Sequence, residues 1–231
     1  MLLLLLLLIF YIFYLCHQTN SYHRSAYYKV TKQSFRSVWM DAGRKGEYLV
    51  FQVLRHYEEQ GARFLFNCYL PKEDGTTTET DVLMIHPTGL YVFESKNYSG
   101  WIFGHEQAKT WTQTLPQGRG RAHKEHFYNP ILQNKGHIKW LKRYLGNEKL
   151  PMHSVIVFSD RCTLKKIELT SSQALVINRY RLEASVEQIM KTSPCCLAEY
   201  EVDRIYEILY PLTQVSEKEK QQHIRDIQQY K

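Results

Sequence analysis

Hydrophobic and polar positions along the chain fall into alternating helix-like and strand-like patterns. From residue 42 to residue 60 the apolar side chains recur at helical spacing, which predicts a helix that ends at Gly61. Residues 63–70 alternate in the manner of a strand. Two short apolar runs, 82–85 and 90–93, flank the turn signal His86-Pro87-Thr88-Gly89 and predict a β-hairpin.

The second half of the chain continues with both kinds of pattern. Asn129 followed by Pro130 predicts the start of a helix that runs to Leu145. Further strands are predicted at 101–104, 152–158 and 174–177, and further helices at 183–191 and 198–209. This order of elements predicts an α/β domain with a central mixed β-sheet flanked by helices.

The first residues are far more apolar than the rest of the chain. After Met1 come fifteen residues that are almost all apolar, which is short for a spanning helix of roughly 20 residues, although tilt and residues up to 22 can make up the difference. The alternative is a cleaved signal peptide, but no Lys or Arg precedes the run and no small-residue cleavage site follows it. We expect an uncleaved single-pass membrane anchor at 1–22. Because the following residues are basic, we expect the body of the protein to face the cytoplasm.

Composition sets the remaining boundaries. Residues 23–41 are polar and basic without a convincing period, and they are predicted to form a juxtamembrane linker. The α/β domain is predicted at 42–212, and a polar C-terminal tail at 213–231. The five cysteines show no paired spacing, which favours a reducing compartment over a disulfide framework and supplies no zinc motif.

Basic charge is concentrated between residues 119 and 143. This segment carries seven Lys and Arg side chains against one Glu, in a chain of net charge +7. A local basic surface attracts phosphates or anionic lipid, whereas the plainer alternative is a solvated helix face. The candidate nucleic-acid contacts are Arg119, Arg121, Lys124, Lys135, Lys139, Lys142 and Arg143.

The predicted hairpin carries the candidate chemistry. It brings Asp81, at the start of its first strand, near Glu94 and Lys96, which leave the same face of the second strand. Two carboxylates beside an ammonium can hold a hard divalent cation such as Mg²⁺, which keeps several of its waters. The alternative is a surface hairpin with an ordinary salt bridge. Glu47 lies on the margin of the apolar stripe of the helix at 42–60, where it either faces the core or serves as a favourable acid in the first turn.

Four short motifs follow one another with a recognisable order and spacing. They are Gly46-Glu47, then Glu79-Thr80-Asp81, then residues 94–100 (ESKNYSG), then residues 129–133 (NPILQ). Together, from about Gly43 to Asp160, they resemble the nuclease-related domain (NERD) family, which is grouped with the PD-(D/E)XK restriction-endonuclease-like superfamily. The resemblance implies a restriction-endonuclease-like core and a nuclease-type site.

The resemblance also implies roles for individual residues. Asp81 and Glu94, with the backbone carbonyl of Ser95, would bind Mg²⁺ or Mn²⁺, and Lys96 would orient the attacking water. Glu47 and Gln133 would complete the site from two helices. The function expected is a membrane-anchored, metal-dependent nuclease acting on nucleic acid, DNA more than RNA. The alternative is a non-catalytic, membrane-tethered nucleic-acid-binding or scaffold module with the same fold.

Overall fold

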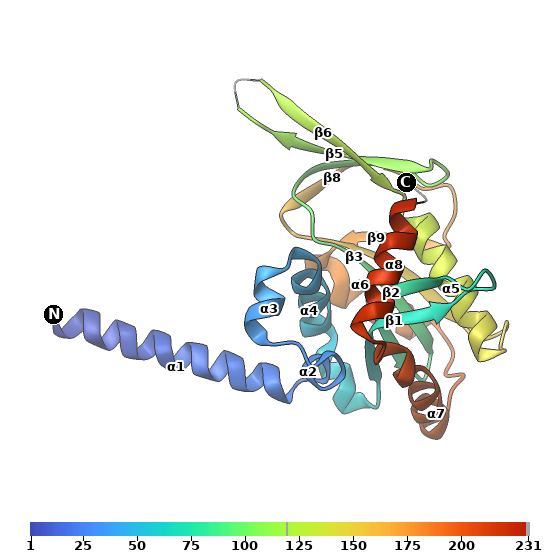
Figure 1. The fold of residues 1–231 in the computed structure, drawn as a ribbon, viewed down its shortest axis with the longest axis horizontal. Coiled ribbons are helices and arrows are strands. Elements are labelled where there is room, and N and C mark those ends of the chain that lie inside the picture. The colour runs from blue at the N-terminus through green and yellow to red at the C-terminus, as the bar shows by residue number, and fades with distance from the viewer. Residues whose placement is uncertain (119, 230–231) are drawn as a thin grey trace.

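The structure, a computed structural model that describes residues 1–118 and 120–229, is built on two β-sheets (Figure 1). The first sheet has five strands in the order β1-β2-β3-β7-β9. These strands are β1 (Arg63–Pro71), β2 (Thr77–His86), β3 (Gly89–Lys96), β7 (Met152–Phe158) and β9 (Ala174–Asn178). The β1, β2 and β3 strands are antiparallel, whereas β3, β7 and β9 run parallel, so the predicted mixed sheet is confirmed.

The β2–β3 hairpin forms at the predicted turn. Val82 pairs with Phe93 and His86 pairs with Gly89, so Asp81 and Glu94 come next beyond the last pair at the open end. Gly89 has φ +122°, and a Cβ there would lie 2.6 Å from the Pro151 carbonyl oxygen. Only glycine fits this close approach without strain.

Alternation along these strands gives the first sheet two apolar faces. Phe64, Phe66 and Val82 face one core, which α4 (Ala42–Leu54), the 3₁₀ turn η1 (Arg55–Gln60) and α6 (Leu182–Thr192) cover. Leu65 and Leu83 face the other core, which α5 (Pro130–Leu145) and α7 (Glu199–Leu209) cover. A fully buried Leu or Phe contributes roughly 1.5–3 kcal/mol, so these two cores hold the helices that carry the candidate site residues.

The second sheet has the order β6-β5-β4-β8, formed by β4 (Gly100–His105), β5 (Thr110–Pro116), β6 (Ala122–Tyr128) and β8 (Cys162–Glu168). Trp111, Ile102 and Phe158 form its small core. The β5 and β6 strands extend well beyond the body as an arm (Figure 1). The sequence predicted only β4 here, because β6 is exposed on both faces and β8 alternates weakly, so neither shows an apolar pattern.

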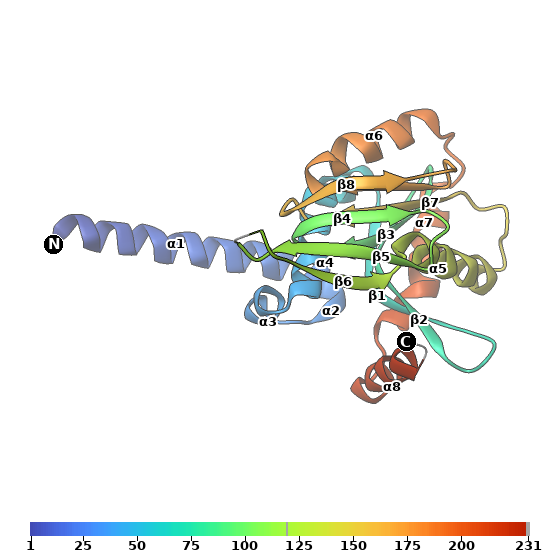
Figure 2. The same cartoon turned by 90° about the horizontal axis from the view of Figure 1, so that it is seen from above.

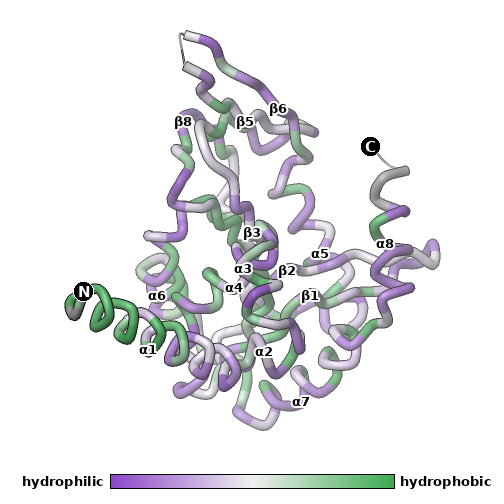
Figure 3. The backbone as a smooth tube through the Cα atoms, turned by 60° about the vertical axis from the view of Figure 1, so that its left-hand side comes forward, coloured by the Kyte–Doolittle hydropathy of each residue, from purple (hydrophilic) through white to green (hydrophobic). Residues whose placement is uncertain are grey.

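The apolar N-terminus forms α1 (Leu2–Arg24), which projects away from the body (Figures 1 and 2). Within the described residues, the stretch Leu3–Arg24 is long and apolar enough to span a membrane, by length and composition alone. The hydrophobic turns of α1 are those that project from the body, whereas its polar last turns lie against the body (Figure 3).

The segment expected to be a juxtamembrane linker is instead folded. It forms α2 (Ala26–Thr31) and α3 (Phe35–Met40), capped by Ser25 and Ser34. Tyr22, Tyr27 and Val38 are fully buried in the same core as α4. Helices of six residues are too short to show a 3.6-residue period, and tertiary packing stabilises them here.

The C-terminal segment is also less independent than a polar tail. The 3₁₀ turn η3 (Tyr210–Thr213) leads into α8 (Glu217–Gln229), and a further turn, η2 (Arg179–Arg181), precedes α6. His223 on α8 is buried, and its Nδ1 lies 2.9 Å from the Thr77 hydroxyl on β2. The same imidazole has Nε2 at 3.7 Å from Glu79 Oε2 and packs edge-on against the Tyr69 ring, so α8 contacts β1 and β2 through a histidine that no local sequence pattern marks.

Candidate active site

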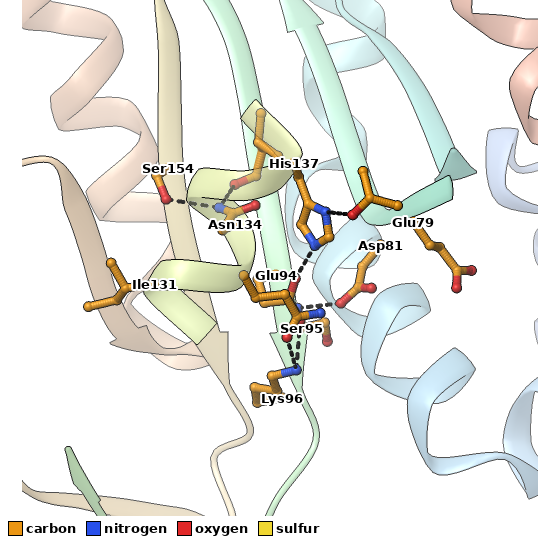
Figure 4. A network of polar contacts seen from close by, with 12 residues as sticks. Glu79, Asp81, Glu94, Ser95, Lys96, Ile131, Asn134, His137 and Ser154 are labelled. Carbon is orange, nitrogen blue, oxygen red and sulfur yellow. Dashed lines mark hydrogen bonds and ion pairs between the residues drawn. The ribbon is translucent and has the colours of Figure 1, made fainter. Parts of the chain in front are cut away.

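The open end of the β2–β3 hairpin brings four predicted site residues together, Asp81, Glu94, Ser95 and Lys96 (Figure 4). Asp81 accepts a hydrogen bond on Oδ2 from the backbone N–H of Ser95, at 2.8 Å. Lys96 donates from Nζ to Glu94 Oε1 at 2.6 Å. The Glu94 side chain is only 1% exposed and that of Lys96 15%, so this is a buried ion pair and not the surface salt bridge that was the alternative.

Helix α5 adds two side chains to the same place. Gln133 accepts from Lys96 Nζ on its Oε1 at 3.2 Å. His137, one turn further along, has Nε2 at 3.2 Å from Glu94 Oε2 and Nδ1 at 2.7 Å from the Thr78 hydroxyl. A hydrogen on Nε2 lets the imidazole donate to Glu94, while Thr78 donates to Nδ1. Glu94 is therefore held through both of its oxygens.

A buried asparagine fixes α5 on the sheet between these two side chains. Asn134 is fully buried and donates from Nδ2 to the Val92 carbonyl at 2.8 Å and to the Ser154 hydroxyl at 2.9 Å (Figure 4). The start of the helix is fixed as predicted, because Asn129 Oδ1 accepts from the Ile131 N–H at 2.9 Å. The helix is thus positioned so that Gln133 and His137 face the hairpin end.

Glu47 reaches the site from α4, as the core-facing interpretation predicts. Its neighbour Gly46 lies so close to β3 that a Cβ would be 2.8 Å from Ser95 Oγ. Glu47 is 8% exposed and accepts on Oε2 from Asn67 Nδ2 at 3.0 Å and from the Tyr27 hydroxyl at 3.3 Å. Tyr27 comes from α2, so the segment expected to be a linker supplies a contact to the site.

Asn67 is a further site residue that the sequence did not reveal. It lies on β1 between residues paired with Val82 and Thr80, and therefore opposite Asp81. Its φ of +50° lies in the left-handed region, which asparagine tolerates better than most residues. No motif marks Asn67 or Thr78, whereas His137 carries one signal, its spacing of one helical turn from Gln133.

The carboxylates of the site repel one another. Burial, followed by the charges of Glu94 and Glu47, raises the pKa of Asp81 well above its ordinary value. Burial also raises the pKa of Glu47 to about 7, although the hydrogen bond from Asn67 opposes the shift. Burial alone would raise the pKa of Glu94, but Lys96 and His137 outweigh it and hold that pKa below its ordinary value.

Lys96 is the cation that balances this cluster. Burial would lower the pKa of its ammonium group, but the carboxylates of Glu94 and Asp81 outweigh burial and raise that pKa. One ammonium thus faces several carboxyl groups, and Asp81, like Glu47, is left without a full counter-charge. A further cation near Asp81 would relieve the repulsion.

The donor set can be compared with what a metal ion needs. Within residues 1–118 and 120–229, no three His, Cys, Asp or Glu side chains converge on one point as a metal-binding group. Asp81 Oδ1 has no hydrogen-bond partner in this part of the chain, whereas Oδ2 is taken by Ser95. The Glu94 carboxylate and the Asp81 carboxylate, which has only one oxygen in a hydrogen bond, suit Mg²⁺ or Mn²⁺. Such ions need few protein oxygens as ligands, because they retain several of their waters.

The predicted basic contacts do not form one continuous surface. Lys135 and Lys139 are exposed on α5, whereas Lys142 donates to the Glu148 carbonyl and Arg143 pairs with Glu73. Arg121 and Lys124 belong to the β5–β6 arm, whose tip lies far from the end of α5 (Figures 1 and 2). Arg119 lies outside the described residues.

Comparison with known proteins gives a consistent result. Residues 42–159, about half of the chain, match the family model described as nuclease-related domain. An uncharacterized protein of Bacillus anthracis is 31% identical over 183 residues, which cover 79% of this chain and 82% of that protein. No solved structure matches the chain.

Proposed function

The chain belongs to the nuclease-related domain family. On that premise we propose that it is a metal-dependent nuclease that hydrolyses phosphodiester bonds and prefers DNA to RNA as its substrate. One observation carries the proposal. Asp81, Glu94, Lys96 and Gln133 converge at one hairpin end, and Asp81 lacks a full counter-charge. A purely structural site gains nothing from buried, mutually repelling carboxylates, whereas a metal-binding site needs them.

The metal ligands in this proposal are Asp81, Glu94 and the backbone carbonyl of Ser95. When bound there, Mg²⁺ or Mn²⁺ supplies a Lewis acid that neutralises charge on the scissile phosphate and lowers the pKa of a coordinated water. Glu94 is already oriented by Lys96 and His137, so its carboxylate needs little rearrangement. The imidazole of His137 thereby serves as a positioning group for a ligand.

The remaining residues act on the substrate side. Lys96 is protonated and lies within reach of Glu94 and Gln133, so its ammonium group is placed to stabilise the negative charge that develops on the phosphate. Gln133 uses its Oε1 for Lys96, which leaves its Nε2 group to donate to a phosphate oxygen or to the attacking water. Glu47, with a pKa raised to about 7 by burial, is suited to hold or release a proton near neutral pH.

Exposed basic residues would bind the nucleic-acid backbone on either side of this centre. Lys135 and Lys139 lie on the same helix as Gln133, and the β5–β6 arm carries Arg121 and Lys124. Contacts of this kind bind phosphates without reading sequence. We place the protein at a membrane, anchored by α1 as a single span, with the α/β body in the cytoplasm.

Incubation of the full-length protein in neutral detergent with plasmid DNA, linear DNA and RNA, with Mg²⁺ or with a chelator, tests this function. We expect Mg²⁺-dependent cleavage of DNA by the wild type. Asp81→Asn should abolish cleavage, because it removes a ligand charge without changing side-chain volume. Asp203→Asn is the matched control, since Asp203 is a surface carboxylate paired with Arg63.

Two results would contradict the proposal. Mg²⁺-independent cleavage, or equal cleavage by wild type and Asp81→Asn, would place any activity outside this site. Salt-sensitive DNA binding with no cleavage under any metal would instead support the alternative, a membrane-tethered binding module.

A further inference from the structure

A second polar site lies where α1 meets the body, away from the hairpin end. An open cavity of about 450 Å³ lies between the last turns of α1 and the α4–η1 helix. Its polar lining comes from His17, Asn20, Ser21 and Arg24 on α1, from Ser25 just after it, and from Arg55 and Glu58 on η1. None of these residues takes part in the proposed nuclease chemistry.

Two arginines give the lining of this cavity its positive charge. Within the described residues, Arg24 forms no ion pair, and Arg55 donates only to neutral partners, to Ser21 Oγ at 3.4 Å and to Gln52 Oε1 at 3.3 Å. Both guanidinium groups are permanently charged and exposed. Glu58 is the one carboxylate in the lining, and burial raises its pKa although Lys29 and Arg55 oppose that shift. Two arginines against one carboxylate leave the cavity lining with a net positive charge, with hydroxyl and amide groups beside it.

The position of the cavity along α1 indicates where its ligand comes from. The apolar run ends at Cys16, and the cavity lining starts at His17 and extends to Arg24. At 1.5 Å per residue this stretch rises about 10 Å along the helix. The headgroup region on one side of a bilayer is about 5–8 Å thick, outside a hydrocarbon core of about 30 Å. The apolar residues 2–16 rise only about 22 Å. Where the bilayer thins locally to match this length, residues 17–24 lie at headgroup level.

We propose that this cavity binds the phosphate group of a phospholipid headgroup, with Arg24 and Arg55 as the charged donors and Asn20 and Ser21 as neutral ones. The two arginines come from separate elements, so a phosphate between them would join the anchor helix to the folded body. Arginine suits this task because its planar fork matches phosphate oxygens. The inference rests on the proposed membrane anchor and is independent of the nuclease chemistry.

Thermal unfolding of the full-length protein in a neutral detergent tests the site. The probe is short-chain dihexanoyl phosphatidylglycerol, titrated below its own micelle concentration, and inorganic phosphate at equal concentrations is the second arm. We expect saturable stabilisation by the lipid and little effect of phosphate. Arg24→Gln and Arg55→Gln should each raise the apparent Kd about tenfold or more, as expected for loss of a hydrogen bond to a charged group.

Arg36→Gln is the matched control. Arg36 is an exposed arginine on α3 that does not line the cavity, so its substitution removes the same charge from the same basic region. An equal loss of affinity in Arg36→Gln would overturn the proposal in favour of diffuse electrostatic attraction. Equal stabilisation by inorganic phosphate would overturn the lipid assignment, because a soluble phosphate compound would then suffice.

Two further measurements separate this site from the rest of the account. Flotation of the wild type with vesicles of phosphatidylglycerol and phosphatidylcholine reports on the anchor, and failure to float would overturn the lipid site together with the anchor. DNA cleavage by Arg24→Gln and Arg55→Gln in detergent should equal that of the wild type. A loss of lipid affinity with unchanged cleavage is the result that supports a separate headgroup site.

Discussion

Replacing Lys96 by methionine should strongly destabilise the metal-free protein. The side chains of Lys96 and Glu94 are 15% and 1% exposed, and their charged atoms are 2.6 Å apart. Methionine retains most of the volume but removes the ammonium group, which leaves the carboxylates of Glu94 and Asp81 facing each other without a counter-charge. Breaking a buried ion pair from one side costs about 3–5 kcal/mol, whereas an exposed pair contributes about 0–1 kcal/mol.

Chemical denaturation of the metal-free protein in neutral detergent at pH 8 measures this cost. Lys166→Met is the matched control, because Lys166 pairs with Glu168 at 2.8 Å on the surface, with side chains 73% and 48% exposed. The double variant Glu94→Gln/Lys96→Met should recover much of the loss, since no buried charge is then left unpaired by the change. A cost for Lys96→Met below about 1 kcal/mol, equal to that of the control, would refute the buried pair.

Three other predictions concern the pH dependence, the imidazole and the basic helix. Because burial raises the pKa of Glu47 to about 7 from 4.5, the folded state binds the extra proton between these values. Metal-free stability should therefore fall by roughly 3 kcal/mol as the pH rises from about 4.5 to about 7, and Glu47→Gln should flatten this part of a denaturation-against-pH profile. His137→Ala should lower the cleavage rate or the metal affinity about 10–100-fold, while circular dichroism shows an intact fold. Unchanged kinetics would show that His137 does not position Glu94. Replacing Lys135 and Lys139 by glutamine should reduce the log–log salt slope of DNA binding by about 2, whereas an unchanged slope would leave this helix face without phosphate contacts.

Local signals in the sequence predicted the elements that frame the site. The Pro87–Gly89 turn fixed the hairpin, and Asn129 with Pro130 fixed the start of α5. Both signals act through the backbone within a few residues, so no tertiary contact is needed to recognise them. The sequence leaves two roles open for Glu47, because its position on the margin of the α4 stripe fits both a core-facing acid and a solvated one.

Other features depend on contacts that span the chain. The spacing of Glu94 and Lys96 places both on one strand face, but only α5 packing over that face buries them. Asn67 and Tyr27 contact Glu47 across 20 residues of sequence, and no motif connects them. The α2 and α3 helices were missed because each has only six residues and depends on aromatic packing against the sheet.

Calorimetric titration of Mn²⁺ into the full-length protein tests most directly whether Asp81 and Glu94 hold one divalent cation. The wild type should bind one Mn²⁺, and Asp81→Asn and Glu94→Gln should each lose the binding heat. Lys96→Met should still bind, because an ammonium group is not a ligand and its removal leaves the carboxylates more negative. Wild-type heats in Asp81→Asn, or no heat in any of the four proteins, would contradict a metal site at the hairpin end.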